Sequence, residues 1–291
     1  MDFLSAYADN PSDRERLYPL FETVFDIPAS LLQDFSARGY WDPTYRPYTF
    51  LDGGQAIANA SYFALPLVVQ GVSITVAAIQ SVMTHPKWRG RGLMTQLMVR
   101  LLDDIDRRYD AALLFTENPS LYEKYGFETT PEVLFTGAVQ PLPLNPPHYL
   151  YRIDPFSEQG TALIANLWSH HAPISREFAP RQYSSSFHLN IYTTFWQERL
   201  HYAPSLDALL IFEVSGQTLI LYDVIASDLP TMEDILRTVG ASVTRIETHF
   251  NPDQLRGPKW SVQTEHTGLY LMMRGALQLP ANLKYPELAH F

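Results

Sequence analysis

Two arginines alternate with two glycines in this 291-residue chain, as Arg89-Gly90-Arg91-Gly92. Glycine tolerates positive φ and leaves the backbone uncovered, so successive N–H groups at this position can turn toward a bound anion. The arginines add fixed positive charge. An ordinary surface turn can have the same composition, and the flanking segments must therefore decide between the two interpretations.

The flanking segments favour a phosphate site. Leucines at positions 93, 97 and 101 recur at i, i+4 and i+8, which predicts an amphipathic helix that begins directly after the turn. The positive end of that helix dipole would lie behind the glycines. A strand-like run over Ile74–Met83 and a break at Pro86 precede the turn. Thr95 stands where a dinucleotide-binding motif needs its third glycine, which excludes that motif. The order of strand, loop and helix therefore indicates another kind of phosphate site.

At these residues the chain resembles the Gcn5-related N-acetyltransferase (GNAT) superfamily, whose signature is R/Q-x-x-G-x-G/A. Arg89 and Gly92 match it, and Met94 departs from it at the last position, where it crowds the first helical turn. Within the superfamily the arrangement is most similar to the enhanced intracellular survival group, which has tandem acetyltransferase-like halves. The resemblance implies that acetyl-CoA is the co-substrate, bound by residues Val82, Met83, Thr84, Arg89, Gly90, Arg91, Gly92, Leu93, Met94 and Asn118.

A second motif follows at the expected separation. NPSLYEKYGF, residues 118–127, resembles the asparagine at the end of the next strand and the L-Y-x-x-x-G-F pattern of the superfamily. Asparagine and Pro119 suit a helix start, and Gly126 suits its end. The resemblance implies that Tyr122 is the general acid that reprotonates the coenzyme A thiolate. A phenol can fill this role because its reference pKa of roughly 10 leaves it protonated at neutral pH.

Three groups could act as the general base that deprotonates the amine. Glu117 follows the strand before this motif, and His85 precedes the glycine turn. The resemblance to the enhanced intracellular survival group adds the C-terminal carboxylate of Phe291, although the sterol-carrier-like third domain of that group is missing here. The residues leave these three alternatives open.

The aromatic segment YWDPTYRPYTF has two interpretations. Tyr40, Trp41 and Tyr45 either fill the core or form part of the wall of an acceptor pocket. Composition adds weaker constraints. A formal charge of −10 disfavours nucleic acid and favours cationic acceptors such as amines. Without cysteine there are no disulfides or thiolate ligands, and no histidine spacing indicates a metal site. We expect no membrane segment and no signal peptide, and hence a cytoplasmic protein.

The order of the elements predicts an α/β (α+β) fold. Long antiparallel strands over Gln55–Val69 and Val72–Met83 feed the glycine turn, and a short buried strand over Ala111–Thr116 suits parallel pairing. We therefore expect a mixed, mainly antiparallel sheet flanked by helices, in two tandem halves. These halves are an acetyl-CoA-binding domain at 1–140 and a degenerate acetyltransferase-like domain at 151–291, joined by a proline-rich linker at 141–150.

The second half repeats the order of strand, Asn-Pro and short helix at Asn251-Pro252. Its loop at 227–234 has no glycine and carries Asp228, Glu233 and Asp234, and Leu255 stands in place of the tyrosine. We expect it to be structural, to shape the acceptor pocket, or to form a homo-oligomer interface. The sequence thus predicts an acetyl-CoA-dependent N-acetyltransferase that acts on an amine of a small molecule or peptide. The alternative is a non-catalytic acyl-CoA-binding sensor or assembly module.

Overall fold

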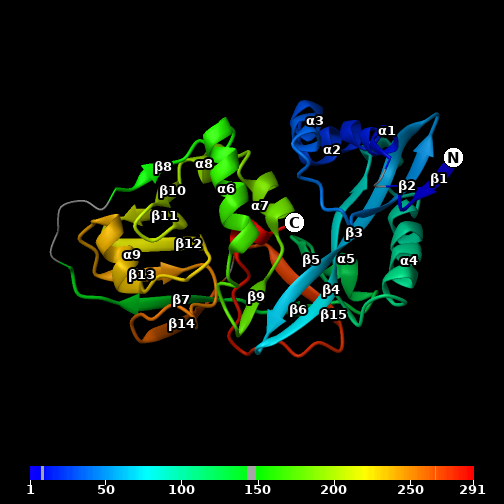
Figure 1. Cartoon of the computed structure of the whole chain (residues 1–291). Coiled ribbons are helices and arrows are strands. Elements are labelled where there is room, and N and C mark those ends of the chain that lie inside the picture. The colour runs from blue at the N-terminus through cyan, green and yellow to red at the C-terminus, as the bar shows by residue number, and fades with distance from the viewer. Residues whose placement is uncertain (8–9, 143–148, 266) are drawn as a thin grey trace.

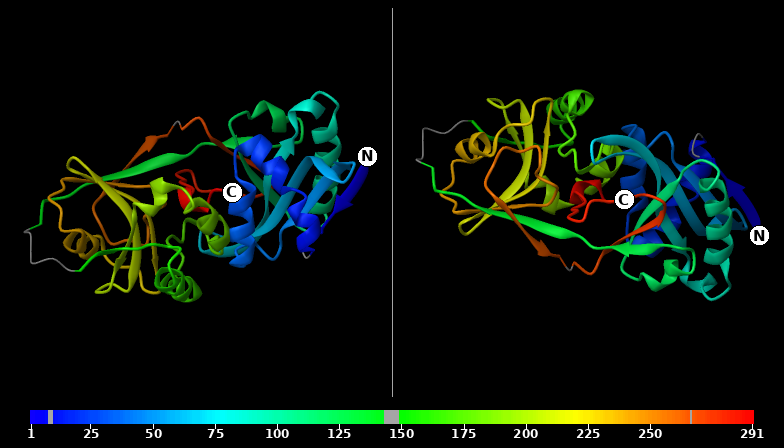
Figure 2. Two further views of the ribbon diagram at one scale, coloured as in Figure 1. Left: turned by 90° about the horizontal axis from the view of Figure 1, so that it is seen from above. Right: turned by 90° about the horizontal axis from the view of Figure 1, so that it is seen from below.

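The computed structural model describes residues 1–7, 10–142, 149–265 and 267–291. Two β-sheets lie next to each other, each covered by helices, and the C-terminal segment passes between them (Figures 1 and 2). The helices are α1 (Pro11–Glu15), α2 (Tyr18–Phe25), α3 (Ala29–Ala37), α4 (Leu93–Ile105), α5 (Ser120–Glu123), α6 (Glu158–His170), α7 (Ser184–Asn190), α8 (Thr194–Gln197) and α9 (Met232–Val239), with 3₁₀ turns η1 (Pro86–Trp88) and η2 (Glu287–Ala289).

The first sheet contains the long hairpin that the sequence predicts. Its order is β1 (Asp2–Ser5), β2 (Arg46–Asp52), β3 (Gln55–Val69), β4 (Val72–Thr84), β5 (Ala111–Thr116), β15 (Tyr270–Gly275) and β6 (Glu128–Thr130), and β9 (Phe178–Pro180) pairs with the far end of β3. Only the β4–β5 pair is parallel among the described strands of this sheet. The predicted mixed, mainly antiparallel fold class is confirmed.

The second sheet has the order β14 (Trp260–Thr264), β7 (Val133–Ala138), β13 (Arg245–Thr248), β12 (Thr218–Ala226), β11 (Ala208–Ser215), β10 (Leu200–Ala203) and β8 (Tyr151–Arg152). Its β12 and β13 are parallel, and α9 connects them. This is the order of β4, α4 and β5 in the first sheet. The shared order supports the prediction of an internal repeat.

The two predicted halves exchange strands. β7 belongs to the first half of the chain but pairs with β13 and β14, and β15 belongs to the second half but lies between β5 and β6. The division of the chain at 1–140 and 151–291 is thus not the division between the sheets. The linker prediction at 141–150 falls largely on residues 143–148, which lie outside the described residues.

Three segments differ from what their sequence patterns predict. Apolar spacing over Pro11–Phe25 predicts one helix, but the chain forms α1 and α2, because Pro19 has no N–H to continue a preceding helix and stands instead in the first turn of α2. The pattern over Phe187–Leu200 also predicts one helix, but it gives the short helices α7 and α8 followed by a strand. After Pro252 the chain forms a turn instead of the predicted helix. Among the helices of the described residues, none has both the length and the apolarity to cross a bilayer.

The core under α4 explains why this helix is fixed to the first sheet. Its buried face consists of Leu93, Leu97, Met98, Leu101, Leu102 and Ile105, which pack against residues of β2 to β5. Each fully buried Leu or Met side chain contributes roughly 1.5–3 kcal/mol of transfer free energy. The helix start, and with it the glycine turn, is therefore held rigidly at the end of β4.

Candidate active site

A β-bulge interrupts the β3–β4 pair just before the strand reaches the glycine turn. The register shifts between Asn59 and Ser61, and Ser81 on the opposite strand has φ +53°. The Asn59 amide donates to the Ser81 carbonyl at 2.8 Å, and the Ser61 hydroxyl donates to the Gln80 carbonyl at 3.0 Å. Because these side chains are buried, the bulge has a fixed geometry. Sequence reasoning missed it, although buried polar residues inside an apolar strand were a usable signal.

Beyond the bulge, β4 separates from β5. The two strands pair only over Ala77–Ile79, so from Gln80 to Thr84 this edge of β4 has no strand partner among the described residues. Unpaired N–H and C=O groups on a strand edge can bind an extended, amide-containing molecule. Val82 packs toward the α4 side, whereas Met83 is buried against the N-terminal helices and can offer only its backbone.

The glycine turn lies at the start of α4, as predicted. Gly90 and Gly92 have φ of +76° and +72°, and Gly92 is the N-cap of a helix that has no side-chain cap. The backbone N–H groups of residues 90–95 form no hydrogen bond within the described part of the chain. Together with the helix dipole they form a site for an anion.

Two arginines flank this turn. The Arg89 guanidinium donates to the Thr84 carbonyl at 3.2 Å, and that of Arg91 stacks 4.5 Å from the centre of the Trp88 ring. Neither forms an ion pair with another described residue. Both positive charges therefore remain uncompensated beside the anion site.

Tyr122 lies in α5 and belongs to the buried core cluster that also contains Leu93 and Leu97 of α4. Its side chain is 7% exposed, and its hydroxyl has no hydrogen-bond partner among the described residues. Burial, with a smaller contribution from Tyr125, raises the pKa of Tyr122 to about 12. The phenol is therefore protonated at neutral pH and free to donate.

The other predicted polar residues lie at the surface. Glu117 and Asn118 are exposed after β5, and the amide oxygen of Asn118 accepts from the Ser120 hydroxyl at 2.8 Å. His85 caps η1, since its Nδ1 accepts from the Lys87 N–H at 3.2 Å. Neither Glu117 nor His85 lines the cavity described next.

A small cavity of about 30 Å³ lies beside the bulge. It is enclosed by α2, α3 and the following loop on one side, by α7 on the other, and by Phe291, and its lining residues are Phe21, Leu32, Phe35, Trp41, Asp42, Phe63, Gln80, Ser81, Ser185, Ser186, Leu189 and Phe291. Trp41 is thus in a pocket wall, as one interpretation of the aromatic segment predicted. Tyr45 is buried behind Trp41 at 5.0 Å between ring centres, and Tyr40 stacks on His188 of α7 at 3.8 Å.

Asp42 is the carboxylate of this cavity, and sequence reasoning missed it. Its Oδ1 accepts from the Thr44 N–H at 2.7 Å and from the Thr44 hydroxyl at 2.5 Å. These bonds fix the side chain while Oδ2 has no hydrogen bond or ion pair to a described residue. The sequence signal was an Asx turn, Asp42-Pro43-Thr44, next to the aromatic residues.

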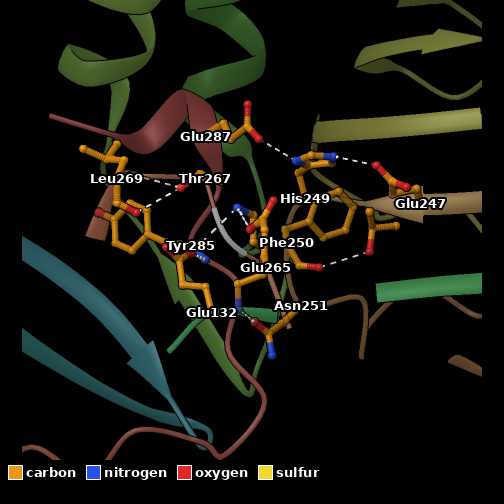
Figure 3. A network of polar contacts seen from close by, with 12 residues as sticks. Glu132, Glu247, His249, Phe250, Asn251, Glu265, Thr267, Leu269, Tyr285 and Glu287 are labelled. Atoms are coloured by element: carbon orange, nitrogen blue, oxygen red, sulfur yellow. Dashed lines mark hydrogen bonds and ion pairs between the residues drawn. The ribbon is translucent and has the colours of Figure 1, made fainter. Parts of the chain in front are cut away.

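A buried polar network fixes the C-terminal segment against the second sheet (Figure 3). His249, after β13, pairs with Glu287 at 2.5 Å and Glu247 at 3.1 Å, and Lys284, 1% exposed, pairs with Glu265 at 2.6 Å. Because Lys284 and Glu287 belong to the segment that ends at Phe291, this network anchors the cavity wall.

Phe291 itself packs between the Phe63 and Phe115 rings, each 5.3 Å away between ring centres. The side chain therefore occupies a position shared by the cavity and the end of β5. The assignment of its carboxylate as the base stays a prediction.

His249, Glu265 and Glu287 bring possible metal-ligand atoms within 4.8 Å of one another. Both imidazole nitrogens of His249 are already paired with carboxylates, and Lys284 supplies a positive charge at Glu265. These contacts satisfy the cluster as a hydrogen-bonded ion network, and we assign it a structural role.

Known proteins share this domain and this fold. Residues 9–130 match the acetyltransferase (GNAT) domain family. The uncharacterized N-acetyltransferase YhbS of Escherichia coli K12 is 30% identical over 103 residues, which are 35% of this chain and 59% of that protein, so the match spans about three fifths of the curated relative.

Among the solved structures that align over 94% of this chain are two of particular use here. They are a probable N-acyltransferase of unknown function from Enterococcus faecalis V583 (TM-score 0.61, 16% identity, 72% of that chain) and Eis1 from Mycobacterium abscessus (TM-score 0.56, 17% identity, 74% of that chain). At these identities the likeness concerns the fold, and it extends over both sheets. The bulge, the separated strands and the glycine turn all lie within residues 9–130, the segment that matches the acetyltransferase (GNAT) domain family.

Proposed function

We propose that the protein transfers an acetyl group from acetyl-CoA to an amine of a small molecule or peptide. The observation that carries this proposal is the separation of β4 from β5 directly before the glycine turn. The free strand edge suits the amide-rich pantetheine arm, and the N–H groups of residues 90–95 suit the pyrophosphate. The thioester would then lie between the strand ends, near the bulge.

The acceptor enters from the cavity side of β4 in this proposal. The cavity residues Gln80 and Ser81 belong to the bulge, so an amine held there lies beside the thioester. Asp42 is the group that attracts a protonated amine, and Trp41 contributes a π face for the same cation.

In the reaction the amine nitrogen attacks the thioester carbon, and the C–S bond of the resulting tetrahedral intermediate breaks. Tyr122 gives its proton to the departing sulfur. Holding the two reactants in line supplies much of the rate, since effective molarities on the order of 10⁵ M are reached in well-oriented systems. The amine proton leaves to water or to one of the predicted bases, His85, Glu117 and the carboxylate of Phe291.

The test is release of free thiol from acetyl-CoA in the presence of a panel of amines, with coenzyme A binding measured in parallel. We expect saturable turnover with at least one class of amine and saturable binding of coenzyme A. Binding without turnover on any amine would favour the acyl-CoA sensor. Absence of binding would overturn the assignment of the cofactor site.

A further inference from the structure

A second cavity, of about 750 Å³, lies at the end of β12 in the second half of the chain. Its walls come from the tip of the β3–β4 hairpin, the segment at 172–181, the loop at 227–231 between β12 and α9, and residues 254–256. Three of its lining residues are Arg176, Arg181 and Arg256. We call this site the arginine groove.

The three arginines come from separate segments, and the backbone of each segment is fixed. The Arg176 N–H donates to Asp253 Oδ2 at 2.9 Å, and the Arg181 N–H donates to the Pro66 carbonyl at 2.8 Å. The carbonyl of Arg256 accepts from the Met232 N–H, at the start of α9, at 2.9 Å. The groove is therefore formed by the tertiary fold and not by one charged loop.

Three acidic residues near the groove have hydrogen-bond or ion-pair partners of their own. Asp253 accepts from the Ser175 hydroxyl, the Arg176 N–H and the Gln254 amide. Glu233 pairs with Arg237 at 2.6 Å, and Asp234 forms the capping box of α9 with Thr231. None of the three arginines has an ion pair in the described part of the chain. The carboxylates of Glu233 and Asp234 are thus paired within α9 and its cap.

Formal charge indicates the class of ligand. Three guanidinium groups and one lining carboxylate, Asp228, leave an excess of two positive charges in the groove of a protein whose net charge is −10. A phosphate group carries about two negative charges at neutral pH and binds guanidinium forks well. A single carboxylate would neutralise only half of the excess.

The position in the fold agrees with this assignment. β12 pairs with β13 only as far as Leu221, so these strands separate as β4 and β5 do, and the groove lies at the loop that corresponds to the glycine turn. η2 packs against β12, and its Glu287 pairs with His249 after β13. The chain itself thus covers the strand ends where a pantetheine arm would bind, while the phosphate end stays open.

We propose that the arginine groove is a second ligand site that binds the phosphate group of a small phosphorylated molecule. The volume is in the range of sites that hold such molecules. The site is independent of acetyl transfer, because its arginines lie outside the acetyltransferase site of the first half.

The test is binding of inorganic pyrophosphate by calorimetry to the full chain. Wild type should show two sites, one at the glycine turn and one in the arginine groove, and Gly92→Asp should keep only the second. In the Gly92→Asp background, Arg176→Gln and Arg256→Gln should each weaken this binding about tenfold, because each removes one charge-assisted contact. Arg107→Gln, at an exposed residue just after α4 that is paired with Asp103, is the matched control and should change nothing.

Two results would overturn the groove assignment. One is an unchanged affinity for pyrophosphate in the Arg176→Gln and Arg256→Gln variants. The other is no pyrophosphate binding in the Gly92→Asp background while wild type still binds coenzyme A. Citrate that binds as tightly as pyrophosphate would overturn the phosphate assignment. If wild type shows only the groove site, the cofactor assignment of the first half fails and the groove proposal stands. Acetyl transfer by the double arginine variant should equal that of wild type.

Discussion

His249 and Glu287 are joined by a hydrogen bond of 2.5 Å that ties the end of β13 to the C-terminal segment. Burial alone would lower the pKa of His249, but the hydrogen bonds with Glu247 and Glu287 outweigh it and raise the pKa to about 9. The pKa of Glu287 is lowered, since its bond with His249 outweighs its own burial. The imidazole is therefore charged at neutral pH, and it pairs with the C-terminal segment that ends at Phe291.

The first prediction concerns the pH dependence of folding. Because the pKa of His249 is higher in the folded than in the unfolded protein, its contribution is complete below about pH 6.5 and is lost as the pH rises through about 9. It amounts to about 3 kcal/mol. The pKa values of Glu247 and Glu287 are lowered, so these groups have the opposite pH dependence. Their contribution to the free energy of unfolding is present above about pH 4.5 and is lost as the pH falls.

Denaturant unfolding between pH 5 and 10 measures this effect. The free energy of unfolding should fall above pH 7 in wild type, and His249→Gln should flatten that alkaline fall. His170→Gln is the control, because His170 is exposed at the end of α6. An equally steep alkaline fall in His249→Gln would contradict the assignment.

The second prediction concerns Tyr122. Tyr122→Phe removes the proton donor and keeps the ring packed, so kcat should fall about 10²- to 10³-fold while the Kd of coenzyme A stays the same. Tyr125→Phe is the matched control, since Tyr125 lies three residues on and its buried hydroxyl has no partner among the described residues. Steady-state kinetics with binding by calorimetry separates the two effects. Full kcat in Tyr122→Phe would exclude it as the acid.

The third prediction concerns the glycine turn. Gly92→Asp puts a carboxylate among the free N–H groups and strains a residue with φ +72°. Coenzyme A affinity should fall by at least about 100-fold, because the pyrophosphate loses its contacts with the N–H groups and is repelled by the new carboxylate. Gly39→Asp controls for strain, because Gly39 has φ +73° with equally open space and lies after α3. It should lose stability and keep coenzyme A affinity. Equal affinities in both variants would contradict the turn assignment.

Local patterns in the sequence predicted the hairpin, the turn and the helix of the first sheet well. The β3–β4 hairpin, the glycine turn and α4 follow one another in the chain, and periodicity and backbone freedom determine each of them. The exchange of β7 and β15 between the sheets was not predictable in this way, because each short strand finds its partners through pairing far along the chain. The cavity was missed for the same reason, since it forms only where α7 meets α3 and the C-terminal segment.

The last prediction concerns Asp42 and tests the acceptor side. Asp42→Asn keeps an oxygen for the bonds from Thr44 and removes the negative charge, so the fold should be retained while the KM of a cationic amine rises about tenfold. Asp52→Asn, at an exposed residue at the end of β2, is the control for the loss of one negative charge from the protein. Since the interaction is electrostatic, added salt should raise the wild-type KM toward that of the variant and leave the variant little changed. If Asp42→Asn instead lowers kcat at constant KM, Asp42 takes part in proton transfer. It would then be the general base, the role for which the sequence offered His85 and Glu117.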